Sequence, residues 1–433
     1  MTATDTIFAL ASGAGRAAVA VLRISGPATG PILTALAGPL PTPRFASLRR
    51  LRMPDSEEIL DRALLLWFPT PRSYTGEDAA ELQLHGGPAV IAGVAESLVA
   101  LGARPAEPGE FTRRAFLNGR MDLTEAEGIA DLVAAETAGQ RRQALAQVEG
   151  ALAARVAGWS HGCARLLAHQ EAAIEFADDD LPTDLSSRAR VGAASLRAEL
   201  EKHLADGGRG ERLRDGLSIA ILGAPNAGKS SLLNALAGRD AAIVSARAGT
   251  TRDVVEVRLD LAGIPVILAD TAGLREAAED IEAEGIRRAL ARAEAADLRL
   301  AIFAGDQPPD AATLALLGPD TLAIASKADL APSPLPDALP VSAATGQGME
   351  ALRARLTEAA VARAGGEALL TRPRHRAALT EAARWLAEAE QAPLPELTAE
   401  ALRAAVRALG RLSGRVGVEE ILDIVFRDFC IGK

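Results

Sequence analysis

The sequence is poor in cysteine, lysine and aromatic residues, and each shortage limits the structure or the function that we expect of the chain. With two cysteines among 433 residues, no disulfide framework is expected, which is typical of proteins in a reducing cytoplasm. Aromatic residues make up 3% of the chain, which argues against an extended platform for stacking nucleic-acid bases. Of the 47 basic residues four are lysines, which we expect at positions where arginine does not substitute: Lys202, Lys229, Lys327 and Lys433.

Charge and hydropathy exclude two further classes of protein. The formal net charge of −10 argues against a broad basic surface that coats nucleic acid, although it leaves room for a local basic patch. No apolar stretch approaches the roughly 20 residues that span a bilayer, and the first residues lack the basic start and apolar run of a secretory signal. We therefore expect a cytoplasmic protein with no membrane partner and about two to four domains.

The first 212 residues are patterned as a mixed domain followed by helices. Residues 1–120 carry apolar runs of strand length, an alternating segment and a helical pattern, at 18–25, 62–68, 79–87 and 88–101. Residues 121–212 are predicted to be helical, with an apolar stripe from Leu145 to Leu167 at steps of three and four residues. The glycines of GGRGER at 207–212 predict a flexible joint.

The second half alternates strand and helix patterns and then returns to helix. Residues 213–371 predict a parallel sheet wrapped by helices, with strands at 217–222, 254–261, 264–270, 298–303 and 321–326. Residues 372–433 are predicted to be helical and to pack against residues 121–212. The expected fold class is α/β and α: an N-terminal α/β domain, a discontinuous helical domain, and a second α/β domain inserted into it.

Residues 223–230, GAPNAGKS, follow a predicted strand and open a predicted helix. This is the GxxxxGK[ST] phosphate loop in the context that it requires. Backbone N–H groups of such a loop surround phosphate oxygens, Lys229 reaches the β- and γ-phosphates, and the Ser230 hydroxyl binds Mg²⁺. The plainer alternative is a glycine-rich turn between strand and helix, which the companion motifs outweigh.

Three further motifs follow strands of the same predicted domain. Asp270 to Gly273, DTAG, suits a contact with Mg²⁺ and with a γ-phosphate. Ser326 to Asp329, SKAD, suits guanine, because the Asp329 carboxylate accepts from the base N1–H and amino group, which adenine lacks. Ser342 and Ala343 complete the base pocket, and the loop 249–253, GTTRD, is able to close over Mg²⁺. Together the motifs predict a Ras-like P-loop GTPase domain.

Segments at both ends carry a resemblance that the central motifs alone would not. SYTGEDAAELQLHGG, PGEFTRRAFLNGRMDLTEAEGIADLV and the terminal FCIGK make the chain similar to the MnmE (TrmE) family of tRNA-modification GTPases over its whole length. The resemblance implies a folate-binding and dimerisation domain at residues 1–120 and a GTPase domain inserted into a helical one. It also implies a homodimer and a heterotetramer with FAD-dependent MnmG. With tRNA as substrate, the pair would add an aminomethyl or carboxymethylaminomethyl group at C5 of the wobble uridine.

For the nucleotide, the resemblance implies Mg²⁺ at Ser230 and Thr251, and K⁺ at Asn226, Ser245, Arg247 and Thr250. Lys229 and Glu282 would be catalytic, Glu282 by positioning the attacking water; without the resemblance, Glu282 reads as a solvated helix residue. A potassium ion would supply the charge that an arginine finger supplies elsewhere. The implied GTP-binding residues are Asn226, Ala227, Gly228, Lys229, Ser230, Ser231, Ser245, Ala246, Arg247, Ala248, Gly249, Thr250, Thr251, Asp270, Thr271, Ala272, Gly273, Ser326, Lys327, Asp329, Ser342 and Ala343.

For the folate, 5-formyltetrahydrofolate or 5,10-methylenetetrahydrofolate, the resemblance implies Arg23, Glu81, Arg120 and Lys433. Arg23 and Glu81 are charged residues inside apolar strand patterns, which requires a partner for each; an internal salt bridge between them is the alternative. Cys430 is either a nucleophile towards the one-carbon carrier or a packed small residue.

Two features depart from the pattern or stay open. Ser326 stands where the guanine motif usually has asparagine, so weaker base affinity is expected. Arg403, Arg407, Arg411 and Arg415 form a basic stripe at steps of four, either for tRNA or MnmG or as a solvated face paired with acidic neighbours. A switch-type GTPase of ribosome assembly would explain the central motifs and leave FCIGK and the folate positions unexplained.

Overall fold

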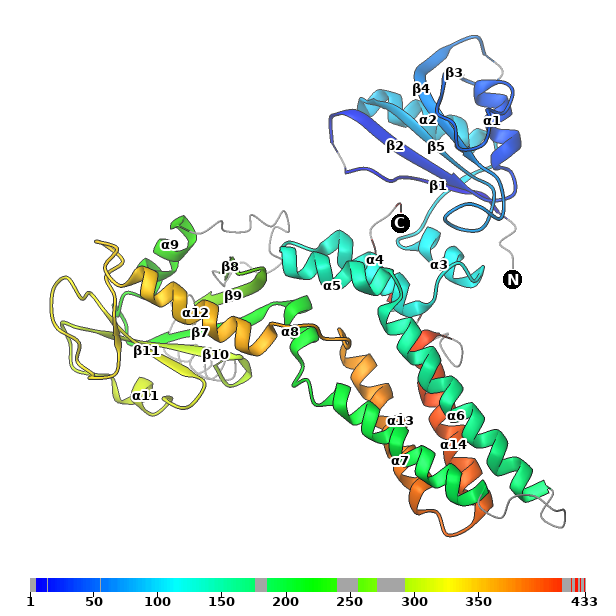
Figure 1. Cartoon of the computed structure of the whole chain (residues 1–433). Helices are drawn as coiled ribbons and strands as arrows, with labels where there is room; N and C mark the ends of the chain where they lie inside the picture. The colour runs from blue at the N-terminus through cyan, green and yellow to red at the C-terminus, as the bar shows by residue number, and fades with distance from the viewer. Residues whose placement is uncertain are drawn as a thin grey trace, which may run out of the picture. The chain divides into compact units, whose positions relative to one another are not determined.

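The computed structural model describes residues 5–13, 15–54, 56–175, 185–239, 256–270 and 293–414, and residues 422, 425, 426, 429 and 432. The chain forms two compact units (Figure 1). The first comprises residues 1–130, 147–160 and 407–433, and the second residues 131–146 and 161–406. Each unit holds one sheet together with helices, which agrees with the predicted fold class of α/β and α.

The sheet of the first unit is covered on one face by two helices. Its strands lie in the order β3-β4-β5-β2-β1-β6, and alternate side chains of the central strands pack with α1 and α2 in one core. Period-2 alternation explains this, since one face of each strand is apolar. The elements are β1 (Ile7–Leu10), β2 (Ala17–Ser25), α1 (Thr29–Ala37), β3 (Ser47–Arg52), β4 (Ile59–Phe68), β5 (Ala79–Gly86), α2 (Pro88–Ala100) and β6 (Arg104–Pro105).

The described residues of the C-terminal segment belong to this first unit. Phe426 and Phe429 pack in a small apolar cluster with Leu123 at the start of α4 (Leu123–Ala134), close to α3 (Glu110–Leu117). The ring centroids of Phe116 and Phe426 are 6.4 Å apart, and those of Phe426 and Phe429 are 5.4 Å apart. Residues more than 300 positions apart in sequence therefore share one core.

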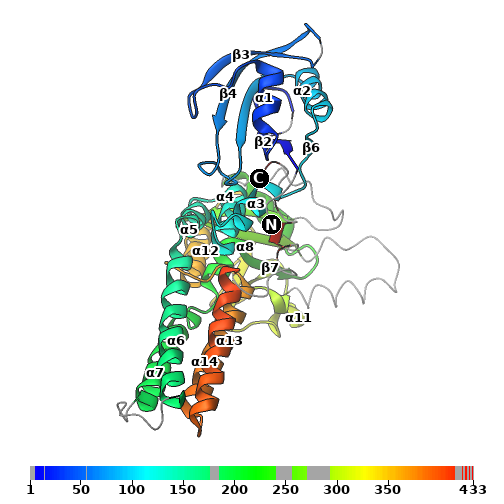
Figure 2. The ribbon, with the colours of Figure 1, turned by 90° about the vertical axis from the view of Figure 1, so that its right-hand side faces the viewer.

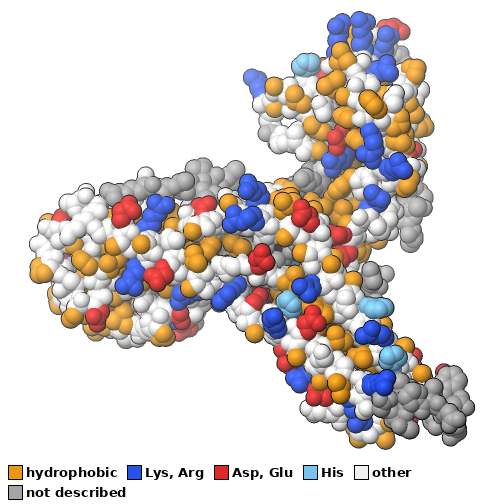
Figure 3. All heavy atoms as spheres, viewed as in Figure 1, with side chains coloured by type: hydrophobic (Ala, Val, Ile, Leu, Met, Phe, Trp, Pro, Cys, Tyr) orange, Lys and Arg blue, Asp and Glu red, His pale blue; other side chains and the backbone are white. Residues whose placement is uncertain are grey.

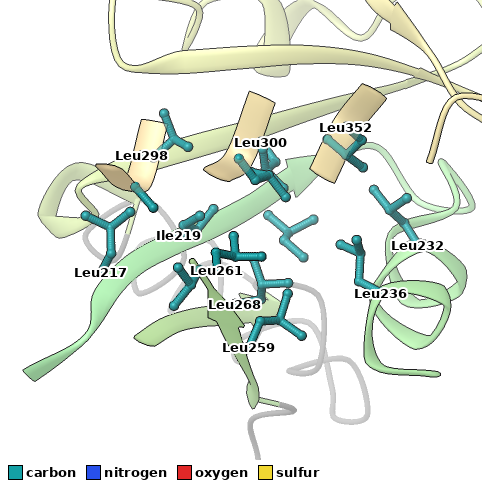
Figure 4. Packing of buried hydrophobic residues seen from close by; sticks show 14 of the residues in the cluster. Leu217, Ile219, Leu232, Leu236, Leu259, Leu261, Leu268, Leu298, Leu300 and Leu352 are labelled. Carbon is teal, nitrogen blue, oxygen red and sulfur yellow. The ribbon is translucent and has the colours of Figure 1, made fainter. Parts of the chain in front are cut away.

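The sheet of the second unit is parallel except at one edge. Its order is β12-β11-β10-β7-β9-β8, and β8 alone among these runs antiparallel to its neighbour. Figure 4 shows leucines of the strands meeting α9 and α12 in one core. The elements are β7 (Leu217–Gly223), α9 (Lys229–Arg239), β8 (Glu256–Leu261), β9 (Ile264–Asp270), β10 (Leu298–Ala304), α11 (Ala311–Leu314), β11 (Thr321–Ser326), β12 (Leu339–Pro340) and α12 (Met349–Ala364).

Long helices make up the remainder of the described chain. Figures 1 and 2 show α7 beside α13, and an ion pair of 3.1 Å joins Arg197 to Glu390 between them, as the predicted packing of the two helical stretches requires. Burial raises the pKa of Cys163 to about 12, which identifies this thiol as a packing residue. The helices are α5 (Ala138–Val148), α6 (Ala151–Glu175), α7 (Leu185–Leu204), α8 (Arg209–Asp215), α13 (Pro373–Gln391) and α14 (Pro395–Ser413).

Two local predictions were wrong. The apolar stripe does not continue through one helix, because α5 ends at Val148 and Gly150 adopts a φ of +83°, which a glycine tolerates. Leu145 is accordingly 44% exposed, whereas Val156 and Trp159 are buried. The predicted flexible joint at 207–212 instead leads into helix α8, where Arg212 pairs with Asp297 at 2.6 Å.

Candidate functional site

The phosphate loop joins the central strand β7 to helix α9. Gly223 ends the strand at a φ of +153°, and a Cβ there would lie 2.5 Å from the carbonyl oxygen of Ile302, so glycine is required. Asn226 and Gly228 have φ values of +58° and +90°. These left-handed residues turn the backbone into a nest of N–H groups in front of the N-terminus of α9, a ready-made anion site.

Lys229, the first residue of α9, extends back over this loop. Its Nζ donates to the carbonyl oxygens of Gly223 at 2.9 Å and Ala224 at 2.8 Å, and the residue is 8% exposed. The ammonium is thereby fixed as a point charge at the mouth of the nest. The next residue, Ser230, is exposed in the first turn of α9, where a hydroxyl is accessible to a metal ion beside bound phosphate.

The other motif residues meet the loop at the carboxyl edge of the sheet. Asp270 ends β9 opposite Ile221 of β7, and Ser326 ends β11, so both are delivered to the same edge by parallel strands. Among the described residues no group of three or more His, Cys, Asp or Glu is arranged to hold a metal ion. A magnesium ion at this edge would take phosphate oxygens of a nucleotide among its ligands, beside the exposed Ser230 hydroxyl.

The guanine motif follows β11 as predicted. Lys327 adopts a φ of +56°, and its Nζ lies 2.9 and 3.0 Å from the carboxylate oxygens of Asp306. Asp329 is exposed, while Ser342, after β12, is fully buried. The Ser342 hydroxyl accepts from the N–H of Thr345 at 3.2 Å and so shapes the turn that carries Ala343. The exposed Asp329 carboxylate remains accessible to a base.

Ser326, the residue that departs from the usual asparagine, contacts the phosphate loop directly. Its hydroxyl donates to the carbonyl oxygen of Ala227 at 2.5 Å, and it is 6% exposed. The side chain therefore ties the base motif to the phosphate loop, a role that the sequence pattern alone did not reveal.

Replacing Ser326 with alanine should weaken nucleotide binding, because the Ala227 carbonyl would lose its buried donor. An unsatisfied buried carbonyl costs about 1–3 kcal/mol, so we expect affinity for GDP to fall by about tenfold. Titration with a fluorescent GDP analogue measures this. The conservative variant Ser326→Thr retains the hydroxyl and should bind more tightly than Ser326→Ala; equal affinities of wild type and Ser326→Ala would contradict the link.

The remaining predicted site residues of this unit lie outside the described residues. They include the residues expected to hold K⁺ other than Asn226, the second Mg²⁺ ligand Thr251, and Glu282. The full set is Ser245, Ala246, Arg247, Ala248, Gly249, Thr250, Thr251, Thr271, Ala272, Gly273 and Glu282, and for Asp270 the structure describes the backbone alone.

A second charged site lies in the first unit. The Arg23 guanidinium on β2 donates to one Glu81 carboxylate oxygen at 2.9 and 3.1 Å, so the salt-bridge alternative for these two residues holds. Arg23 also lies within 3.5 Å of the Gly432 carbonyl oxygen. The structure therefore brings the C-terminal signature to the predicted folate residues, although Cys430 and Lys433 lie outside the described residues. Arg120 is exposed and packs its stem against Gly76.

Two aromatic rings complete this second site. The Arg23 guanidinium carbon lies 5.2 Å from the ring centroid of Tyr74 and 5.8 Å from that of Phe111, within the range of cation–π attraction. The Tyr74 hydroxyl forms a hydrogen bond of 2.7 Å with Thr112, and burial raises the pKa of Tyr74. Neither ring was among the residues predicted from sequence; the signal for one of them was that Tyr74 is the single tyrosine of an aromatic-poor chain.

The basic stripe on α14 is at least partly paired. Arg403 forms ion pairs with Glu171 at 2.8 Å and with Glu400 at 3.2 Å, which favours the solvated-face alternative for that residue. Arg415 lies outside the described residues. In the described part of the chain, no helix has the length and apolarity needed to cross a membrane.

Comparison with known proteins gives full-length matches. The family model for the MnmE helical domain matches residues 123–430, and that for the GTP-binding protein TrmE N-terminus matches residues 6–120. A "tRNA modification GTPase MnmE" from Gluconacetobacter diazotrophicus is 58% identical over 99% of this chain and 98% of its own. One from Paramagnetospirillum magneticum is 56% identical over 99% of this chain and all of its own. Among solved structures, the G domain of the T. maritima FeoB iron transporter aligns with a TM-score of 0.26 at 24% identity, covering 33% of this chain and 98% of that one.

Proposed function

The chain belongs to the MnmE family of tRNA modification GTPases, and we propose that its GTP hydrolysis serves the modification of the wobble uridine of certain tRNAs. The observation that carries the GTPase activity is the phosphate loop, with Lys229 fixed at its mouth and linked to the guanine motif through Ser326. The family match over both ends of the chain, rather than over the GTPase motifs alone, carries the tRNA role.

The nucleotide site acts by position and charge. The backbone nest and the N-terminus of α9 hold the phosphates, and Lys229 offsets the charge that develops on the β- and γ-phosphate oxygens. Asp329 selects guanine, and Ser342 and Ala343 line the base pocket. Magnesium supplies charge neutralisation when bound, held by Ser230 and Thr251.

Potassium binding and water activation complete the proposed mechanism of the GTPase. Asn226 is a residue of the phosphate loop with a left-handed backbone conformation. It would bind K⁺ together with Ser245, Arg247 and Thr250. Glu282 would position the attacking water. Rates of hydrolysis in potassium and sodium chloride buffers test the ion site, since equal rates would speak against it.

The charged site of the first unit fits a pterin and its one-carbon unit. Glu81 would accept from a ring N–H and amine, while Arg23, Arg120 and Lys433 would bind the acidic tail of 5-formyl- or 5,10-methylenetetrahydrofolate. The fit rests on the half-buried Arg23–Glu81 pair and the flanking rings of Tyr74 and Phe111. Calorimetry with 5-formyltetrahydrofolate on a chain lacking Lys433 tests this assignment.

The domain division and the partners complete the proposal. Residues 1–120 form the folate-binding and dimerisation domain, and residues 213–371 form the GTPase domain, inserted between helical residues 121–212 and 372–433. The chain acts in the cytoplasm as a homodimer and in a heterotetramer with FAD-dependent MnmG. The basic stripe of Arg403 to Arg415 and a nucleophilic Cys430 are secondary parts of this proposal.

Loss of the gene should remove the modified wobble uridine nucleosides from bulk tRNA. Digestion of tRNA from a deletion strain, followed by liquid chromatography and mass spectrometry, measures them, and reintroduction of the gene on a plasmid should restore them. Unchanged nucleosides combined with accumulation of ribosomal precursors would point to a GTPase of ribosome assembly instead.

A further inference from the structure

The sheet of the first unit leaves one face uncovered by α1 and α2. Along β3 the side chains alternate, so that Leu51 is fully buried towards the helices while Leu48 and Arg50 lie on the opposite face. In the antiparallel register between β3 and β4, Arg50 lies directly opposite Arg62. Both arginines are exposed, so two guanidinium groups share one cross-strand position on an open surface.

Like charges directly opposite each other on one face destabilise a sheet. Among the described residues, no carboxylate lies within ion-pairing distance of either guanidinium group. The nearby Asp61 carboxylate accepts from the backbone N–H of Arg62 at 2.7 Å and from that of His85 at 2.9 Å, and it lies 2.7 Å from the His85 ring Nδ1. Arg50 and Arg62 therefore form a pair of positive charges that no carboxylate of the described residues neutralises, although the net charge of the chain is −10.

The surface around this pair is partly apolar. Leu48 and Leu64 form the neighbouring cross-strand pair and are 68% and 40% exposed. Figure 3 shows basic side chains, which are arginines in this part of the sequence, gathered over the region of β3 and β4. An open β-sheet surface with concentrated positive charge fits an extended polyanion, because a row of phosphates follows such a surface without entering a pocket.

We propose that Arg50 and Arg62 dock the phosphodiester backbone of the tRNA substrate, an inference that rests on the proposed function in tRNA modification. Charge complementarity favours this occupant over a second copy of the chain. In a symmetric contact between two copies centred on these residues, four guanidinium groups would face one another and repel. The arginines would position the tRNA without reading its sequence.

The test uses the full chain and an unmodified tRNA transcript labelled with a fluorophore. Arg50→Glu/Arg62→Glu should lower tRNA affinity by at least about tenfold at low salt, and Arg50→Gln/Arg62→Gln should shrink the slope of log affinity against log salt by about 1 for each arginine. GTP hydrolysis without tRNA should stay at the wild-type rate. Arg355→Glu, at an exposed position of α12, is the matched control and should bind tRNA like wild type.

Three outcomes would overturn the docking surface while leaving the proposed function intact. They are unchanged tRNA affinity in the double variants, an equal loss in Arg355→Glu, and no measurable binding of tRNA by the wild-type chain. A change of mass in light scattering, from dimer to monomer, would assign the face to a contact between copies instead. The tRNA nucleoside profile of the deletion strain separately decides the function.

Discussion

Replacing Lys229 with methionine should reduce GTP hydrolysis by a factor of about 10²–10³ or more, the usual effect of removing one preorganised donor to transition-state charge. The loop and the lysine are held together, because Nζ donates to the carbonyl oxygens of Gly223 and Ala224. The ammonium therefore needs little reorganisation when charge develops on the phosphate oxygens. Methionine keeps the length and apolar stem of the side chain and removes the charge.

Phosphate release under saturating GTP measures kcat, and binding of a fluorescent nucleotide measures affinity. Lys202→Met is the matched control, because Lys202 is an exposed lysine on helix α7 and its loss should leave both quantities unchanged. Circular dichroism should be the same for all three proteins. Hydrolysis within threefold of wild type in Lys229→Met would reject the placement of this residue at the phosphates.

Strands that are buried on both faces were predictable from sequence. The runs at 264–270 and 321–326 coincide with β9 and β11, because a strand covered on both faces must be apolar throughout and then end at polar residues. The phosphate loop was predictable for a similar reason, because its glycines, lysine and serine lie close together in sequence. Local signals of this kind need no knowledge of the remaining chain.

Elements whose stability comes from distant partners were not predictable. The edge strand β3 has the sequence SLRRLR, in which the arginines obscure the alternation of buried and exposed side chains. This alternation is recognised only from the pairing of β3 with β4. Helix α8 looked like a glycine-rich joint, yet Arg212 finds Asp297, 85 positions along the chain. The bond from Ser326 to the Ala227 carbonyl spans 99 positions. Sequence periodicity carries no information about such pairings, which exist only after the chain has folded.

Replacing Arg114 with methionine should destabilise the first unit by about 3 kcal/mol. Its guanidinium is 5% exposed and binds three carboxylates, of Asp5 at 2.8 Å, Glu110 at 2.9 Å and Glu77 at 3.3 Å. Removing one partner of a buried ion pair costs about 3–5 kcal/mol, and the lower end applies because Asp5 is 44% exposed. Hydrogen exchange of peptides covering β1 and α3 in the full chain should accelerate about 10²-fold. Arg16→Met, at an exposed position before β2, should leave that exchange unchanged.

The same arginine makes this stability dependent on pH. Burial by itself would raise the pKa of Asp5 and of Glu110, but hydrogen bonds and charge from Arg104 and Arg114 outweigh it and hold both values below the usual range. A carboxyl group whose pKa is lowered by folding stabilises the fold at pH values above its pKa in the unfolded chain, which is about 4. This stabilisation is lost as the pH falls through the pKa of the folded state. The difference in melting temperature between wild type and Arg114→Met should therefore be largest near pH 7 and shrink below pH of about 4. A difference that grows on acidification, measured by scanning calorimetry, would show that Arg114 acts through packing rather than charge.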